Sequence, residues 1–370
     1  MKRRDWLLTA LSGSAALMPA AWADRPRYGG TLRVFPSLPA ANLEPFTRVT
    51  TAAQPDAARR AWRFTLRPNV QLQGGTPWTS AYAVEKIKAA FPGFGAAGAG
   101  PGTVIVTTDA VTSDLPRVLD RKVLIESGPF EPVLPPGPRP TMRANELYWN
   151  GRPFLDAIEL AGSAQDADLV ELSLTGSRRL RPDSHRIWST LPIELIAIDA
   201  AGAHPQVRQA LGLAIDRSSI VKVLLQGHGE AAGGLSPQWL SGYAFVFPVQ
   251  TDLAKAKSLL GGRPPQMTLS YTAGDVLLRL IAERIAVNAR DIGLAIQPKS
   301  VAGAELKMLR EPVEEWPNYD TERAVMEERK LIPVVHVPHL YAIHNRVRGW
   351  DEANDGRSAD LHLESIWVEA

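Results

Sequence analysis

A strand, a helix and a second strand follow one another without interruption between residues 267 and 298. MTLSYT (267–272) and LAIQP (294–298) are predicted to be strands. The helix between them begins after Asp275 and ends at Gly293, and its apolar positions repeat with the period of a helical turn: Leu277, Leu280, Ile281, Ile285 and Ile292. A strand–helix–strand unit of this length makes its two strands parallel. The chain is therefore predicted to be an α/β protein.

Two further helical segments lie in HPQVRQALGLAIDRSSIVKVLLQGHGEAAGGLSP, residues 204–237. Pro205 suits the first turn of a helix, because that turn does not need its N–H group. Ser218 begins a second apolar-faced run, which the glycines from Gly227 onward end. Asp216 and Arg217 lie at the joint, where the carboxylate is predicted to cap the second helix. This role is structural and requires no catalysis.

Earlier segments follow the same rules. TLRVF (31–35), the alternating WRFTLRPNV from residue 62 and TVIVTT (103–108) are predicted strands, and Thr79 is predicted to cap a helix. FPGFGAAGAGPG (91–102) is low in complexity and is predicted to be a flexible connector. Its glycines satisfy G-x-G-x-x-G, but a dinucleotide site needs them to open a helix, and here a helix precedes and a strand follows.

The first 23 residues have the pattern of a secretory signal. Basic residues 2–4 precede an apolar run over 6–19, and Ala21 and Ala23 are the small residues that a signal peptidase reads. The apolar run is too short and interrupted to span a membrane, and a buried N-terminal helix is the disfavoured alternative. We expect cleavage after Ala23, by either the general secretory or the twin-arginine route.

Composition narrows the location and the partners. The chain has no cysteine, which excludes disulfides, thiolate nucleophiles, Cys-ligated metals and a lipid-bearing N-terminal Cys. Removing the signal takes three basic residues and one acidic residue from 41 Lys+Arg and 39 Asp+Glu, leaving 38 of each. A neutral chain has no long-range attraction for nucleic acid or anionic membranes. We expect an exported, soluble, periplasmic protein, long enough for two lobes.

No motif for catalysis or metal binding is recognisable. The chain after residue 23 has no G-x-S-x-G elbow and no phosphate-binding G-x-x-x-x-G-K loop. His336 and His339, with His344 nearby, lie in a segment that favours extended backbone, which puts the first two on opposite faces. Metal ligands must converge, so a metal site is disfavoured. We expect no enzyme activity and no cofactor; a secreted hydrolase built from scattered Ser, His and Asp residues is the catalytic alternative.

Five segments together resemble the family 5 solute-binding proteins of ABC importers, a group that includes oligopeptide, dipeptide and nickel binders. The most specific is VRQALGLAIDRSSIVKVLLQGHGEAAGGLSP (207–237), which is similar to the V-R-x-A…A-I-D-R block of the family. The others are YGGTLRVFPS (28–37), WRFTLRPNVQLQGGTPWTSAYAVEKIKAA (62–90), ESGPFEP (126–132) and LYWNGRPFLDAIEL (147–160). Their order and spacing agree with the family from residue 28 to about 300.

The resemblance implies a two-lobed periplasmic binding protein of type II-like α/β fold, with mixed sheets and an interlobe cleft. Lobe one would comprise residues 24–194 and 306–370, and lobe two residues 195–305, joined by crossover strands. The implied function is capture of a peptide or another small solute, without catalysis, for an ABC permease in the inner membrane. We expect a monomer.

Side chains near the lobe edges are the candidate ligand contacts. Aromatic residues on loops suit a cleft that binds a partly apolar guest, although each can equally pack in a core. The predicted ligand-binding residues are Phe35, Ser37, Trp239, Tyr243, Trp316 and His336. Alanine at Trp239 or Trp316 is expected to weaken binding with little loss of stability.

The chain also departs from the family pattern. Members are usually longer, and only a stub stands between Pro45 and Trp62. The segment Trp-x-x-Asp-Tyr-x-Asp-Pro, which supplies a carboxylate for the amino terminus of a bound peptide, is reduced to WPNYD (316–320), with Asp320 as the candidate amine partner. The alternative function is therefore a degenerate member that acts as a non-transport periplasmic interaction protein.

Overall fold

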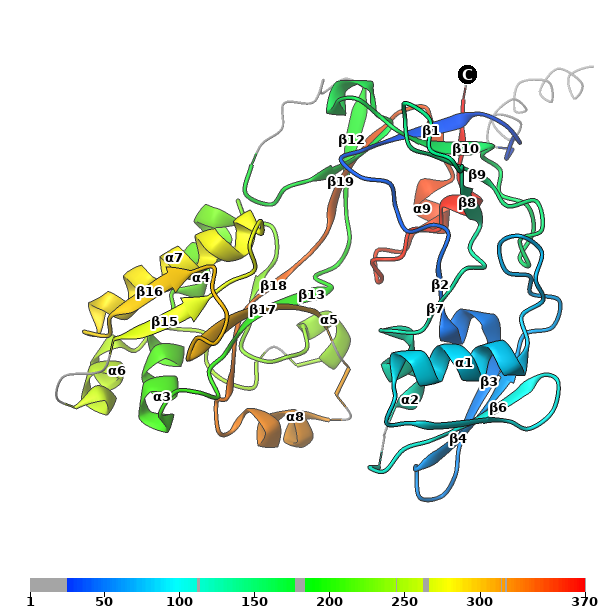
Figure 1. Cartoon of the computed structure of the whole chain (residues 1–370). Helices are drawn as coiled ribbons and strands as arrows, with labels where there is room; N and C mark the ends of the chain where they lie inside the picture. Colours follow the sequence, from blue (N-terminus) through cyan, green and yellow to red (C-terminus); the bar gives the residue numbers. More distant parts are fainter. Residues whose placement is uncertain are drawn as a thin grey trace, which may run out of the picture. The chain divides into compact units, whose positions relative to one another are not determined.

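The computed structural model describes residues 25–111, 114–176, 184–243, 245–261, 266–313, 315–316 and 318–369 (Figure 1). The predicted signal, residues 1–23, lies outside the described residues. The chain forms two compact units. Unit 1 comprises the chain up to residue 169 together with 344–354 and the residues from 361, and unit 2 comprises 170–343 and 355–360. The chain therefore passes between the units within β11 (Leu169–Leu172) and within β19 (Leu340–His344). It passes twice more near the C-terminus, after residue 354 and after residue 360.

These units do not have the bounds of the predicted lobes. Unit 2 includes residues 170–194 and 306–343, which the resemblance assigns to lobe one. Residues 306–343 contain two strands that pair with β13 (Glu194–Asp199): β17 (Leu306–Pro312) and β18 (Leu331–Val337). The predicted lobes stay a prediction about which segments move together.

One layer of unit 1 is an antiparallel sheet in the order β3 (Thr50–Pro55), β4 (Ala61–Leu66), β6 (Thr103–Thr107), β5 (Gly95–Gly98). Helix α1 (Ser80–Ala90) lies beside it, and Thr79 caps that helix as predicted by accepting a hydrogen bond from Tyr82 N. The predicted connector 91–102 is wrong at residues 95–98, because they pair with β6. Gly95 is required in β5, since a Cβ there would collide with Thr107 Oγ1.

The remaining strands and helices of unit 1 complete its frame. β1 (Thr31–Phe35) runs parallel to β10 (Ala157–Leu160), which pairs with β9 (Thr141–Ala144), and β9 pairs with β8 (Phe130–Pro132). Two short antiparallel pairs are β2 (Glu44–Pro45) with β7 (Leu124–Ile125), and β20 (Val347–Arg348) with β21 (Trp367–Val368). The short helices are η1 (Phe46–Val49), α2 (Leu115–Asp120), η2 (Ala164–Asp166), α9 (Trp350–Ala353) and η4 (Leu363–Ser365).

Unit 2 is built on a mixed sheet in the order β14 (Glu230–Ala231), β18, β13, β17, β15 (Met267–Ser270), β16 (Ile296–Lys299). β13 is antiparallel to β17 and β18, whereas β15 is parallel to β16 and β17. Helix α7 (Val276–Asp291) connects β15 to β16, which confirms the predicted strand–helix–strand unit. Asp275 caps α7 by accepting from Leu278 N. A further strand, β12 (His185–Ser189), neighbours β19, which neighbours β11.

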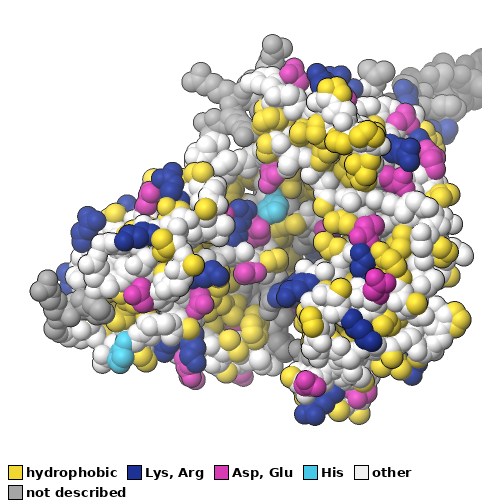
Figure 2. Space-filling view, in the orientation of Figure 1, with side chains coloured by type: hydrophobic (Ala, Val, Ile, Leu, Met, Phe, Trp, Pro, Cys, Tyr) yellow, Lys and Arg dark blue, Asp and Glu magenta, His cyan; other side chains and the backbone are white. Residues whose placement is uncertain are grey.

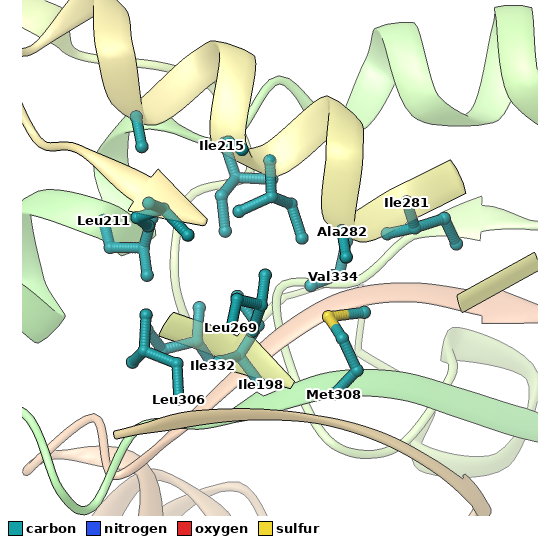
Figure 3. Packing of buried hydrophobic residues seen from close by; sticks show 14 of the residues in the cluster. Ile198, Leu211, Ile215, Leu269, Ile281, Ala282, Leu306, Met308, Ile332 and Val334 are labelled. Carbon is teal, nitrogen blue, oxygen red and sulfur yellow. The ribbon is translucent and has the colours of Figure 1, made fainter. Parts of the chain in front are cut away.

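The core of unit 2 lies between this sheet and two of its helices (Figure 3). Leu211 of α3 (Pro205–Ala214), and Ile281 and Ala282 of α7, meet apolar side chains of four strands: Ile198, Leu269, Leu306, Met308, Ile332 and Val334. α6 (Leu253–Leu260) contributes Ala256. On α7, Leu278 is buried where the sequence predicted Leu280, which is half-buried. The helical stripe is thus shifted by a small rotation rather than misplaced.

The joint at Asp216 and Arg217 is structural, as predicted. Asp216 caps α4 (Arg217–Ser219) by accepting from Ser219 N, and the π-helical turn η3 (Ile220–Leu224) follows. Arg217 is buried, and its guanidinium donates to the carbonyl oxygens of Pro333 and Gly212 at 2.8–3.0 Å. Burial lowers the pKa of Arg217 to about 10, below its ordinary value. One side chain thus ties the end of α3 to β18.

Candidate functional site

Strand β13 separates the core of unit 2 from a second, smaller hydrophobic layer. Successive side chains of a strand point to opposite faces. Ile196 and Ile198 accordingly belong to the core, whereas Leu195 and Ala197 contact a second cluster that includes Met326. That layer is formed by α5 (Gln238–Ser241) and α8 (Tyr319–Met326), which Figure 1 shows on the other side of the sheet from α7.

Four half-buried aromatic residues flank this second layer: Trp239, Tyr243, Trp316 and Tyr319, here called the aromatic cluster. The Tyr243 and Tyr319 rings meet edge to face, with centroids 5.3 Å apart at 83°. Trp239 Nε1 donates to Pro192 O at 2.8 Å. Three of the predicted ligand contacts therefore converge, although α5 and residue 316 are far apart in sequence.

A buried carboxylate holds the loop that carries the aromatic cluster. Glu322 of α8 is fully buried, and its Oε1 accepts from the backbone N–H groups of Leu235 and Ser236. Its Oε2 accepts from the Tyr243 hydroxyl, and burial, followed by this hydrogen bond, raises the pKa of Tyr243 above its ordinary value. Gly234 leaves room for the carboxylate, since a Cβ there would lie 2.7 Å from Oε1. No pattern in the sequence predicts this contact.

His336 lies behind the aromatic cluster in β18 and is 2% exposed. Its Nε2 hydrogen-bonds Leu235 O at 3.1 Å, and its Nδ1 lies 3.3 Å from Glu230 Oε1. Leu235 is the residue whose N–H also reaches Glu322, so both side chains fix the same loop. Ligand contact by His336 itself stays a prediction.

The other two predicted contacts, Phe35 and Ser37, belong to unit 1. Phe35 ends β1 and is half-buried, and Ser37 is exposed two residues later. Asp320, the candidate amine partner, is exposed in the first turn of α8. Their roles in binding stay predictions.

Unit 2 also contains a pocket of about 480 Å³, here called the polar pocket. Its polar lining comes from β11, the cap of α7, β17 and the link between β18 and β19: Glu171, Asp275, Arg310 and His339. Its apolar lining includes Leu172, Leu174, Val276, Leu277 and Leu340. A concave site of some 300–1,000 Å³ with apolar walls and a few polar groups is typical of small-ligand binding.

Glu194, at the start of β13, organises the polar pocket from behind. Arg310 Nε and Nη2 lie 2.7 and 2.6 Å from its Oε2, and His339 Nε2 lies 3.2 Å from the same oxygen. Burial raises the pKa of Glu194, but pairing with His339 and the charge of Arg310 outweigh it, so this pKa lies below its ordinary value. Glu194 therefore stays ionised and holds both lining side chains in place.

The polar pocket and the aromatic cluster share one short segment of chain. Pro192 accepts the hydrogen bond from Trp239, and Glu194, two residues later, pairs with Arg310 and His339. Sequence reasoning singled out His339 only as a disfavoured metal ligand and missed the other lining charges. No local motif marks them, because they come from four segments that only the tertiary fold brings together.

A second hollow, of about 630 Å³, lies in unit 1, but its charges are already paired. Arg143 pairs with Glu131 at 3.2 Å, and Arg152 pairs with Glu146 and Asp156 at 3.0 and 2.7 Å. On the face drawn in Figure 2, basic and acidic side chains are interspersed, without a broad patch of one sign. The polar pocket of unit 2 is therefore the better candidate.

The described ranges contain neither a candidate metal site nor a membrane-spanning helix. In those ranges, no group of three or more His, Asp or Glu side chains is placed to hold a metal ion. No helix there is long and apolar enough to cross a membrane.

Comparison with known proteins supports the family suggested by the sequence. Residues 196–324 match the model of the family described as "Bacterial extracellular solute-binding proteins, family 5 Middle". This range begins within β13 and includes the Arg217 joint, α7, Arg310, Trp316 and Glu322. The resemblance to family 5 is confirmed. No curated protein matches the sequence.

Solved structures share the fold at low sequence identity. The oligopeptide-binding protein AppA from Bacillus subtilis, in complex with a nonapeptide, has a TM-score of 0.70 and 15% identity, covering 94% of this chain and 100% of that one. NikA from Brucella suis, in complex with Fe(III)-EDTA, has a TM-score of 0.67 and 14% identity, and the match covers 87% of this chain and 91% of NikA. AgaA from A. tumefaciens R10, in complex with agropinic acid, has a TM-score of 0.68 and 17% identity, and the match covers 87% of this chain and 89% of AgaA. The predicted fold class, a two-lobed periplasmic binding protein, is confirmed.

Proposed function

We propose that this family 5 solute-binding protein captures a peptide or another small solute in the periplasm and delivers it to an ABC permease. The observation that carries the proposal is the polar pocket beside the aromatic cluster, in the unit that contains the family match. The ligands in similar solved structures range from a nonapeptide to agropinic acid and Fe(III)-EDTA, so the fold accommodates chemically different guests. Binding of this kind requires no bond to be made or broken in the solute.

The polar pocket suits reversible binding. Arg310 and His339 are held by Glu194 before a ligand arrives, so little ordering of these side chains opposes association. The apolar walls, Leu172 and Leu277 among them, offer area that a guest can cover. The aromatic cluster nearby adds flat surfaces that lose little conformational freedom on binding.

Closure of the two units on the ligand is part of this proposal, as are the predicted lobe boundaries and the monomeric state. The chain passes between the units within β11 and β19, and both strands also supply lining residues of the polar pocket, Glu171 and Leu340. A ligand in this pocket would therefore touch the strands that a hinge must bend. Small-angle scattering should show a smaller radius of gyration on ligand addition, and light scattering a monomer mass.

The first test is native mass spectrometry of the protein purified without unfolding, with release and identification of anything bound. Thermal unfolding with a mixture of di- to pentapeptides follows. A ligand at a hundredfold excess over its Kd adds about 2.7 kcal/mol to the free energy of unfolding. Ser173→Trp fills the pocket from an exposed position, and Ser300→Trp is the matched change at an exposed serine outside it. Binding should be lost in S173W and kept in S300W; wild-type protein that binds no solute of any class refutes the proposal.

A further inference from the structure

The polar pocket carries more negative than positive charge. Glu171 and Asp275 line it, and Glu194 lies directly behind Arg310 and His339. Against these three carboxylates stands one permanent cation, Arg310. The positive charge of Arg310 is already neutralised, because two of its nitrogens lie 2.7 and 2.6 Å from Glu194. An anionic group on a ligand would therefore be repelled by the remaining negative charge of the pocket.

Glu171 is the carboxylate that remains open. It is exposed on β11, and within the described ranges its carboxylate makes no hydrogen bond or ion pair. Asp275 is less available, since it accepts from Leu278 N at 2.9 Å and lies 3.7 Å from Arg310 Nη1. The charge of Glu171 also acts on the buried hydroxyl of Tyr341. Burial, and then the charges of Glu171 and Glu194, raise the pKa of Tyr341 above its ordinary value.

The walls around Glu171 are aliphatic. Leu172 and Leu174 follow it along the chain, and Val276, Leu277 and Leu340 line the same pocket. An unpaired carboxylate beside aliphatic walls matches a guest with an alkyl stem and a charged end, since the stem covers apolar surface while the cation meets the carboxylate.

We propose that the polar pocket binds a solute that carries an ammonium or guanidinium group on an aliphatic stem, with Glu171 as the residue that selects the cation. This inference rests on the proposed function, because it names the ligand chemistry of the same site. The cation can come from a basic side chain, a small amine or the amino terminus of a peptide. The charge of the pocket is common to all three, and the test separates them.

The experiment is calorimetric titration of the wild-type protein with five probes. Four of them are peptides with an amidated C-terminus: acetyl-Ala-Lys-Ala, with a side-chain cation only; Ala-norleucine-Ala, with an amino-terminal cation only; acetyl-Ala-norleucine-Ala, which is uncharged; and acetyl-Ala-Glu-Ala. The fifth is 1,5-diaminopentane. The expected order is tighter binding of at least one cationic probe than of the neutral peptide. Glu171→Gln should raise the Kd of that probe about 10- to 100-fold, the loss of one charge-assisted hydrogen bond, and leave the Kd of the neutral peptide unchanged.

Glu327→Gln is the matched control, because Glu327 is also exposed in unit 2 but does not line the pocket. It should leave all five titrations unchanged. Equal binding of cationic and neutral peptides, preference for acetyl-Ala-Glu-Ala, or an unchanged Kd in E171Q overturns the inference while the proposed function stands. Failure of all five probes, together with failure of the broader peptide mixture, counts against the proposed function itself.

Discussion

Replacing Glu322 by alanine tests whether one buried carboxylate holds the loop beside the aromatic cluster. The change removes the acceptor for two backbone N–H groups, those of Leu235 and Ser236, which are 6% and 3% exposed. Each orphaned buried donor costs about 1–3 kcal/mol, so the free energy of unfolding should fall by about 2–6 kcal/mol. The Tyr243 hydroxyl adds little, because its half-exposed ring lets water replace the lost bond.

The assay is urea unfolding of the whole protein, followed by tryptophan fluorescence, together with amide hydrogen exchange at residues 235 and 236, which reports on the loop itself. E322Q keeps one carbonyl oxygen for the two N–H groups and should lose less than half as much stability as E322A. Glu327→Ala, an exposed change at the end of the same helix, should stay within about 0.5 kcal/mol of wild type. If E322A and E327A unfold at the same urea concentration, the carboxylate does not hold the loop and the reasoning is wrong.

Three further predictions concern the frame of unit 2. Arg217→Lys should lower the free energy of unfolding by about 2–4 kcal/mol in urea titrations, because an ammonium cannot reproduce the planar fork on Pro333 O. Trp239→Ala should cost about 2–3 kcal/mol in the same assay, since the ring packs on the second layer and donates to Pro192 O, whereas Trp239→Phe should cost about 1 kcal/mol. The pKa of Glu194 is lowered on folding, so its contribution to the free energy of unfolding is fully present above pH 4.5 and is lost as pH falls through the lower folded value. The stability difference between wild type and Glu194→Gln, measured from pH 3 to 7, should therefore shrink only on the acid side.

The fold could be predicted where local patterns determine structure. The cap at Asp275, the apolar stripe of α7 and the flanking strands all lie within about thirty residues, and their prediction was confirmed. β5 was missed because its residues, Gly-Ala-Ala-Gly, carry no side-chain pattern. They form a strand only because β6 offers a pairing edge that Gly95 can approach closely. A strand determined by its partner is invisible to a reading of its own residues.

The same division applies to the candidate site. Trp239, Tyr243 and Trp316 could be proposed one by one, because an aromatic residue on a polar loop is conspicuous in the sequence. Their convergence depends on Glu322, a single acid within an ordinary helix. The expectation that alanine at Trp239 spares stability is also changed by the structure, since its indole donates to Pro192 O and is half-buried. Loop aromatics proved to be part of the packing as well as candidates for binding.

The charges of the polar pocket depend on strand pairing for their positions. Arg310 and Glu194 lie 116 residues apart, and β13 and β17 bring them together because Glu194 is opposite Pro312 and Ile196 is opposite Arg310 in the antiparallel register. A slip of one residue in that register would send Arg310 to the face of the aromatic cluster. Such a slip would be costly on both faces of the strand. Ile196 and Ile198 are buried in the core, and Leu195 and Ala197 are buried against the second layer. The apolar residues of β13 therefore determine where the charge of the site lies, so substitutions at Ile196 or Ala197 should alter ligand selectivity only when they also lower stability, whereas Glu171, outside this packing, can change selectivity alone.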